Sequence, residues 1–200
     1  MLEQRIQQHF IDSADLKYQA AQALSQPITA AVQAILACVT NGAKVLACGS
    51  GPSAAQAQQF AALCVMGFER ERPELAALAL VPDALWAAAT TTGAGADIAA
   101  LARQVRALGQ AGDLLLVITT GGNEPALLEA VQAAHERDMT VVALSGRDGG
   151  ALVTLLRDTD VQICVQHDRA ARVREVHALV LHCLCDGVDA QLLGEQEIVL

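Results

Sequence analysis

The sequence predicts an α/β fold, in which a mostly parallel five-stranded sheet of flavodoxin or Rossmann type is flanked by helices. Short apolar runs alternate with segments of helical periodicity, and this alternation is typical of parallel strands joined by helical crossovers. The chain has 200 residues, of which 53% are hydrophobic, so one domain can bury a full core. We therefore expect residues 41–200 to form a single domain, preceded by a helical extension over residues 1–40.

The extension is predicted from apolar residues at helical spacing. Leu2, Ile6 and Phe10 begin this pattern, which continues to about residue 24. Pro27 then allows a second helix to about residue 40, and Asn41-Gly42 ends it because glycine accepts the left-handed conformation that follows a helix.

The five expected strands are short apolar runs, and a helical segment follows each of them. The strands are expected at residues 44–48, 76–81, 113–118, 139–145 and 160–165. The helices are expected at residues 54–67, 84–92, 97–109, 124–137 and 170–193, with a short one after residues 146–150. No linker, repeat or low-complexity run interrupts this order.

Composition excludes several classes of function. The formal net charge of −9 argues against direct nucleic-acid binding. The sequence has neither a signal peptide nor an uninterrupted apolar run of about 20 residues, so we expect a cytoplasmic protein. Its six cysteines form no CxxC pair and lie mostly in apolar segments, which favours buried thiols. We expect neither a metal nor a cofactor.

Two loops at expected strand ends could hold an anion. The first is Gly49-Ser-Gly-Pro-Ser53, and the second is Thr119-Thr-Gly-Gly-Asn123, which Glu124 follows. In open α/β sheets, ligands bind beyond the carboxyl ends of the strands, and backbone N–H groups at a helix N-terminus attract phosphate. The predicted ligand-binding residues are Ser53, Thr119, Thr120, Gly121, Asn123 and Glu124.

Glu124 conflicts with phosphate binding at the second loop. Its carboxylate would repel a phosphate dianion, although a carboxylate in a first helical turn also favours the helix dipole, with Asn123 as N-cap. Arg147, Arg172 and Arg174 would offset the repulsion if they reach the cleft.

The motifs at the strand ends resemble those of the sugar isomerase (SIS) domain family. The resemblance lies in residues 48–53, 118–123 and 143–150, and it extends over nearly the whole chain to the phosphoheptose isomerases and to DiaA, the DnaA initiator-associating protein. Longer stretches, such as residues 103–113 and 183–186, look more like DiaA. The resemblance implies a homotetramer in which the N-terminal helices pack between subunits.

The resemblance also makes several residues unexpected. Phosphoheptose isomerases carry a His and a Glu four residues apart on the first helix of the domain, where this chain has Gln59 and Leu63. Ala94 stands in place of an Asp, Arg174 in place of a Gln, and Glu124 in place of a Ser. His182 is the one catalytic candidate retained, and an aldose–ketose isomerisation needs both a base and an acid.

These departures lead to a non-catalytic interpretation. The chain is expected to resemble DiaA, to bind a DnaA-type replication initiator and to promote its assembly at the chromosomal origin. Leu192 and Leu193 are the candidate docking patch. Two alternatives remain open: a phosphoheptose isomerase acting on sedoheptulose 7-phosphate, and a sugar-phosphate sensor without turnover.

Overall fold

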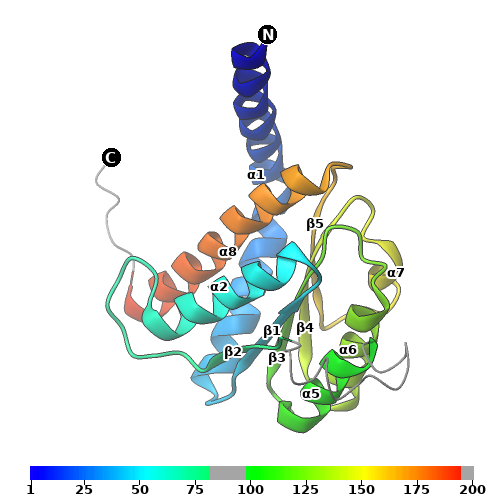
Figure 1. Ribbon diagram of the computed structural model, residues 1–200. Coiled ribbons are helices and arrows are strands. Elements are labelled where there is room, and N and C mark those ends of the chain that lie inside the picture. Colours follow the sequence, from blue (N-terminus) through cyan, green and yellow to red (C-terminus); the bar gives the residue numbers. More distant parts are fainter. Residues whose placement is uncertain (82–97, 195–200) are drawn as a thin grey trace.

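The sheet has five parallel strands in the order β2-β1-β3-β4-β5 (Figure 1). The computed structural model describes residues 1–81 and 98–194. The strands are β1 (Val45–Gly49), β2 (Ala77–Ala79), β3 (Leu114–Ile118), β4 (Thr140–Gly146) and β5 (Val161–Val165). The helices are α1 (Leu2–Thr40), α2 (Pro52–Met66), α5 (Ala100–Leu108), α6 (Pro125–Glu136), α7 (Gly150–Val153) and α8 (Ala170–Leu193). The predicted fold class is confirmed, while the helix expected at residues 84–92 lies outside the described residues.

The strand side chains divide between two cores because alternate residues point to opposite faces of a sheet. Along β3, Leu114, Leu116 and Ile118 pack into one core with α1, α2 and α8. Leu115 and Val117 pack into the other core with α5, α6 and Leu152 of α7. The sheet is therefore covered on both faces, which accounts for strands that are mainly apolar.

The two helices expected at the N-terminus are one continuous helix of 39 residues. Proline inside a helix removes a hydrogen bond and crowds the preceding turn, yet α1 continues through Pro27. Leu24 and Ala31, one turn on either side of it, are both buried in the core. Packing of these neighbours outweighs the local cost, so Pro27 does not end the helix.

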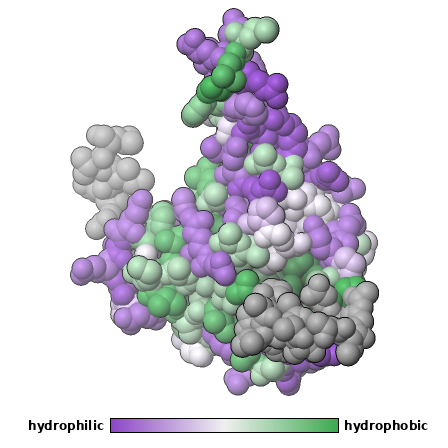
Figure 2. Space-filling view, in the orientation of Figure 1, coloured by the Kyte–Doolittle hydropathy of each residue, from purple (hydrophilic) through white to green (hydrophobic). Residues whose placement is uncertain are grey.

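The first part of α1 extends beyond the domain. Its early apolar side chains are exposed, including Leu2, Ile6 and Phe10, and its first buried residue is Leu16. Figure 1 shows this end standing clear of the sheet, and Figure 2 shows hydrophobic and hydrophilic side chains together on it. This segment is therefore amphipathic, but among the described residues its apolar side chains have no core to pack against.

By length and composition alone, α1 and α8 could each cross a membrane. In the fold, however, both helices contribute buried residues to the core shared with the sheet. On α8 the buried set includes Arg172, His177 and Asp189, whose polar groups bond inside the domain. These are the features of core helices.

Candidate functional site

The two predicted loops leave the sheet side by side. β1 and β3 are neighbours, and Gly49 at the end of β1 is in register with Ile118 at the end of β3. The strand order reverses between these two strands, so the loops flank the switch point at which open α/β sheets bind ligands. The expectation that both loops lie at equivalent strand ends is confirmed.

The first loop is closely packed against the start of α2. A side chain at Gly49 would approach the Ser53 carbonyl oxygen to 2.4 Å, and Gly51 has a φ of +54°. Ser53 is buried, and its N–H donates to the Ser50 carbonyl. No acidic residue or side-chain cap occupies the first turn of α2, which leaves the positive end of its dipole without an internal anion.

The second loop, residues 119–124, is filled by its own acceptors; we call it the cradle. The buried Thr119 hydroxyl oxygen accepts the N–H groups of Gly121 and Gly122 at 3.1 and 2.9 Å. That hydroxyl in turn donates to Oε2 of Glu124 at 2.7 Å. The same carboxylate oxygen accepts the N–H of Asn123 at 3.1 Å. Three backbone donors that could hold an anion are thus already engaged.

Asn123 is not the N-cap of α6, so that prediction is wrong. Glu124 takes the cap position with an extended backbone, at φ −73° and ψ 117°. Pro125 is the cause, because the residue before a proline is kept out of the helical region. The Asn123 amide instead donates to the Gly121 carbonyl and accepts the N–H of Ala151, which ties the cradle to α7.

His182 lies on α8 between an amide and an aromatic ring. Its Nε2 is 3.4 Å from Nε2 of Gln59 on α2. The Phe68 ring stacks on the imidazole with 5.3 Å between ring centroids. Sequence reasoning gave His182 no facing partner; the structure supplies Gln59, although an amide cannot act as an acid or a base at neutral pH. In the described part of the chain, no carboxylate forms a hydrogen bond or ion pair with His182.

Other titratable groups on α8 have partners elsewhere. His177 is fully buried and donates from Nε2 to the Ser145 carbonyl at 3.0 Å; burial lowers its pKa to about 4, so it is neutral. For Glu175, burial raises the pKa, but hydrogen bonds from Ser13 and Arg172 outweigh this and hold it below the usual value. Neither group is therefore placed to act with His182.

Of the three candidate arginines, Arg147 lies beside the cradle. It lines an open basin of about 570 Å³ together with Asn123. Arg172 is buried and bonds to Glu175 and His9. Arg174 is half-buried, and its carbonyl accepts the side-chain N–H of Gln56 at 2.8 Å. The condition that an arginine reaches the cleft is therefore met by Arg147 and not by Arg172.

The remaining predicted positions are dispersed. Leu63 is half-buried against the core beneath α2, and Ala94 lies outside the described residues. Leu192 and Leu193 are 37% and 41% exposed at the end of α8. No group of three His, Cys, Asp or Glu residues within 1–81 and 98–194 is arranged to hold a metal ion.

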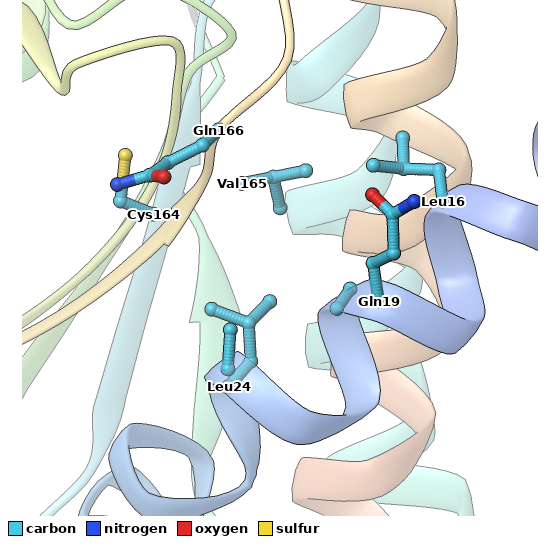
Figure 3. Close-up of a pocket in the computed structure, with 8 residues that line it drawn as sticks. Leu16, Gln19, Leu24, Cys164, Val165 and Gln166 are labelled. Carbon is cyan, nitrogen blue, oxygen red and sulfur yellow. The ribbon is translucent and has the colours of Figure 1, made fainter.

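A separate cavity of about 280 Å³ lies between α1 and β5 (Figure 3). Leu16, Leu24 and Val165 give it an apolar wall, and the amides of Gln19 and Gln166 lie at its edge. It contains none of the predicted site residues. The cradle and His182 thus remain the two candidate parts of a functional site.

Comparison with known proteins places this site in a family context. The sequence profile of the SIS domain matches residues 8–146. The phosphoheptose isomerase of Methylibium petroleiphilum is 60% identical over 199 residues, which cover 99% of this chain and 98% of that protein. The phosphoheptose isomerase of an Azoarcus species is 50% identical over 196 residues, covering 96% and 98%.

Solved structures give the same result. The phosphoheptose isomerase of Neisseria gonorrhoeae superposes with a TM-score of 0.88 at 44% identity, covering 95% of this chain and all of that one. The enzyme of Francisella tularensis gives a TM-score of 0.89 at 40% identity, covering 94% and 98%. These relatives overturn the interpretation of a non-catalytic, DiaA-like protein that binds a replication initiator. That Leu192 and Leu193 form a docking patch remains an untested prediction.

Proposed function

Because the chain belongs to the SIS domain family, we propose that it is a cytoplasmic phosphoheptose isomerase, which interconverts sedoheptulose 7-phosphate and an aldoheptose 7-phosphate. The observation that carries this proposal is identity of 50–60% to proteins named phosphoheptose isomerase over nearly the whole chain. The switch-point loops of the sheet support it, because they place hydroxyls and backbone N–H groups where a phosphosugar would enter.

In this proposal the two loops bind the phosphosugar. Ser53 in the first turn of α2 and Thr120 after β3 supply hydroxyls. Gly121 and Asn123 supply backbone N–H groups once their bonds to Thr119 and Glu124 are exchanged for bonds to the phosphate. The dipole of α2, which has no acid in its first turn, favours the phosphate electrostatically. Thr119 and Glu124 order the cradle from within.

His182 carries the proton transfer. In the ketose-to-aldose direction, a base removes a proton from C1, the resulting enediolate forms, and a proton returns to C2 while the hydroxyl proton moves from O1 to O2. One imidazole can fill both roles on the same face of the enediolate: it takes the C1 proton as the base and, once protonated, returns it to C2 as the acid. Gln59 and Phe68 fix the imidazole plane from two sides, and such orientation is part of general acid–base catalysis.

A second candidate function is phosphosugar binding without turnover. It is favoured because, among residues 1–81 and 98–194, no titratable group bonds to His182: the residue facing it is the amide Gln59, and Leu63, one turn further along α2, is apolar. Such a protein would sense the phosphosugar and release it unchanged.

Turnover separates the two candidates. Purified protein is mixed with sedoheptulose 7-phosphate in deuterated water, and NMR follows both product formation and deuterium entry at C1 and C2. The isomerase proposal expects both, with a loss of roughly 10²–10⁴-fold in kcat for His182→Asn. The exposed neighbour Cys183→Ser serves as the control. Binding with neither product nor exchange would select the sensor, and absence of binding would refute both.

We also propose that the chain forms a homotetramer through α1. The exposed Leu2, Ile6 and Phe10 on the projecting helix support this, because a second copy would bury them. Light scattering coupled to size-exclusion chromatography should give four times the chain mass of 20.9 kDa. A monomer at micromolar concentration would contradict the proposal.

A further inference from the structure

The carboxylate of Glu124 occupies the place in the cradle that a ligand anion would take. We propose that Glu124 is a resident anion that sets the specificity of the cradle, because a sugar phosphate must displace it before the phosphate can bind there. This inference rests on the proposed phosphosugar site, but it concerns binding and can be tested without turnover.

The hydrogen bonds of the cradle support the inference. The N–H of Asn123 and the hydroxyl of Thr119 both point to Oε2 of Glu124. The N–H groups of Gly121 and Gly122 converge on Thr119, whose own proton goes to Glu124. The Thr119 hydroxyl and the Asn123 N–H are thus bonded to one carboxylate oxygen, and the N–H groups of Gly121 and Gly122 are linked to it through that hydroxyl, much as such groups would surround one phosphate oxygen.

Two features keep the carboxylate in place. Pro125 holds the Glu124 backbone extended, and the Glu124 carbonyl accepts the N–H groups of Leu127 and Leu128 at the start of α6. Its side chain is therefore directed back over the cradle and away from α6. Within residues 1–81 and 98–194, no lysine or arginine forms an ion pair with Glu124, so its charge faces an incoming phosphate without a bonded cation.

The consequence is a ligand preference. A phosphate dianion meets like charge and finds three backbone donors engaged, whereas a sugar hydroxyl can donate to the carboxylate. The wild-type cradle therefore discriminates weakly between a phosphorylated sugar and the free sugar. Specificity is a difference of affinities, and here it is reduced by a built-in repulsive group.

Calorimetry on the full-length protein tests the inference with inorganic phosphate, sedoheptulose 7-phosphate and free sedoheptulose as probes. Glu124→Ser removes the charge and leaves a hydroxyl in the cradle. We expect it to bind both phosphate probes at least about tenfold more tightly than wild type, with free sedoheptulose unchanged or weaker. Glu124→Gln keeps the side-chain length and removes the charge, so it should tighten phosphate binding in the same direction.

Glu129→Gln is the matched control. It removes one negative charge from α6, outside the cradle, and we expect its phosphate affinity to stay within about twofold of wild type. An equal gain in this control would attribute the effect to overall charge and overturn the inference. It is also overturned if both Glu124 variants stay within twofold of wild type, or if no variant binds phosphate. Tighter phosphate binding in variants that do not turn over substrate would sustain the inference while the isomerase proposal fails.

Discussion

Replacing Arg72 should cause a large loss of stability, because it forms a buried ion pair with Asp189. Arg72 and Asp189 are each 1% exposed and lie 2.5 Å apart between Nε and Oδ1. The guanidinium also donates to the carbonyls of Cys64 and Leu63, at 2.7 and 3.2 Å. It thereby joins the loop after α2 to the last turns of α8.

Arg72→Met leaves a buried carboxylate without a cation. Oδ2 of Asp189 already lacks a hydrogen-bond partner, so no other group in the described structure takes up the charge. Breaking a buried ion pair in this way costs about 3–5 kcal/mol. This is a large part of the free energy of unfolding of a typical protein, which is about 5–15 kcal/mol. For a chain of this length, the melting temperature should fall by roughly 6–20 °C.

Urea unfolding followed by circular dichroism measures this loss. The double variant Arg72→Met, Asp189→Leu removes both charges, and its stability should recover to within about 1–2 kcal/mol of wild type, because an apolar pair can replace a buried ion pair. A cost below about 1 kcal/mol for Arg72→Met would refute the reasoning. So would a double variant that is no more stable than the single one.

Two further predictions concern the groups around the strand ends. His177 is neutral in the fold, with a pKa of about 4, whereas the unfolded chain binds a proton near pH 6.5. The unfolded state therefore gains protons first as pH falls, and stability should drop by about 1.6 kcal/mol between pH 6.5 and 5. Urea unfolding at several pH values measures this drop, and a His177→Gln variant whose stability falls with pH as steeply as that of wild type would contradict the prediction. Gly122→Ala should destabilise by roughly 2 kcal/mol or more and abolish phosphate binding, since Gly122 has a φ of +74° and an added Cβ would lie 1.9 Å from the Gly149 carbonyl oxygen. Gly121→Ala is the matched control, because a Cβ there meets nothing within 4 Å; equal melting curves for the two variants would refute the steric argument.

The fold was predictable because its signals are local and repeated. Apolar runs mark the five strands, and Asn41-Gly42 marks the end of α1, where Gly42 has a φ of +76°. The continuation of α1 through Pro27 was not predictable, because it depends on Leu24 and Ala31 meeting a core formed by distant segments. Periodicity reports which residues are apolar, but it does not report which partner will cover them.

The position of the site could be predicted from the sequence, but its side-chain partners only in part. The two loops lie together because the strands that precede them are neighbours in the sheet. The partners of His182 could not be predicted, because Gln59 and Phe68 reach it from segments more than 110 residues away in the chain. One signal was available and missed: Pro125 after Glu124 indicates an extended residue at the helix start, and hence a carboxylate that can turn back over the loop.

The long α1 helix implies that local stability changes along a single helix, from its buried part to its projecting N-terminal end. Residues from Leu16 onward share in the cooperative unfolding of the core, because they are buried in it. Residues 2–8 lie beyond the last contacts with α8, which are made by His9, Asp12 and Ser13. An isolated helical segment of that length is marginal in water. Amide protection of these first two turns should therefore depend on protein concentration, so that the N-terminus reports assembly while the rest of the same helix reports folding.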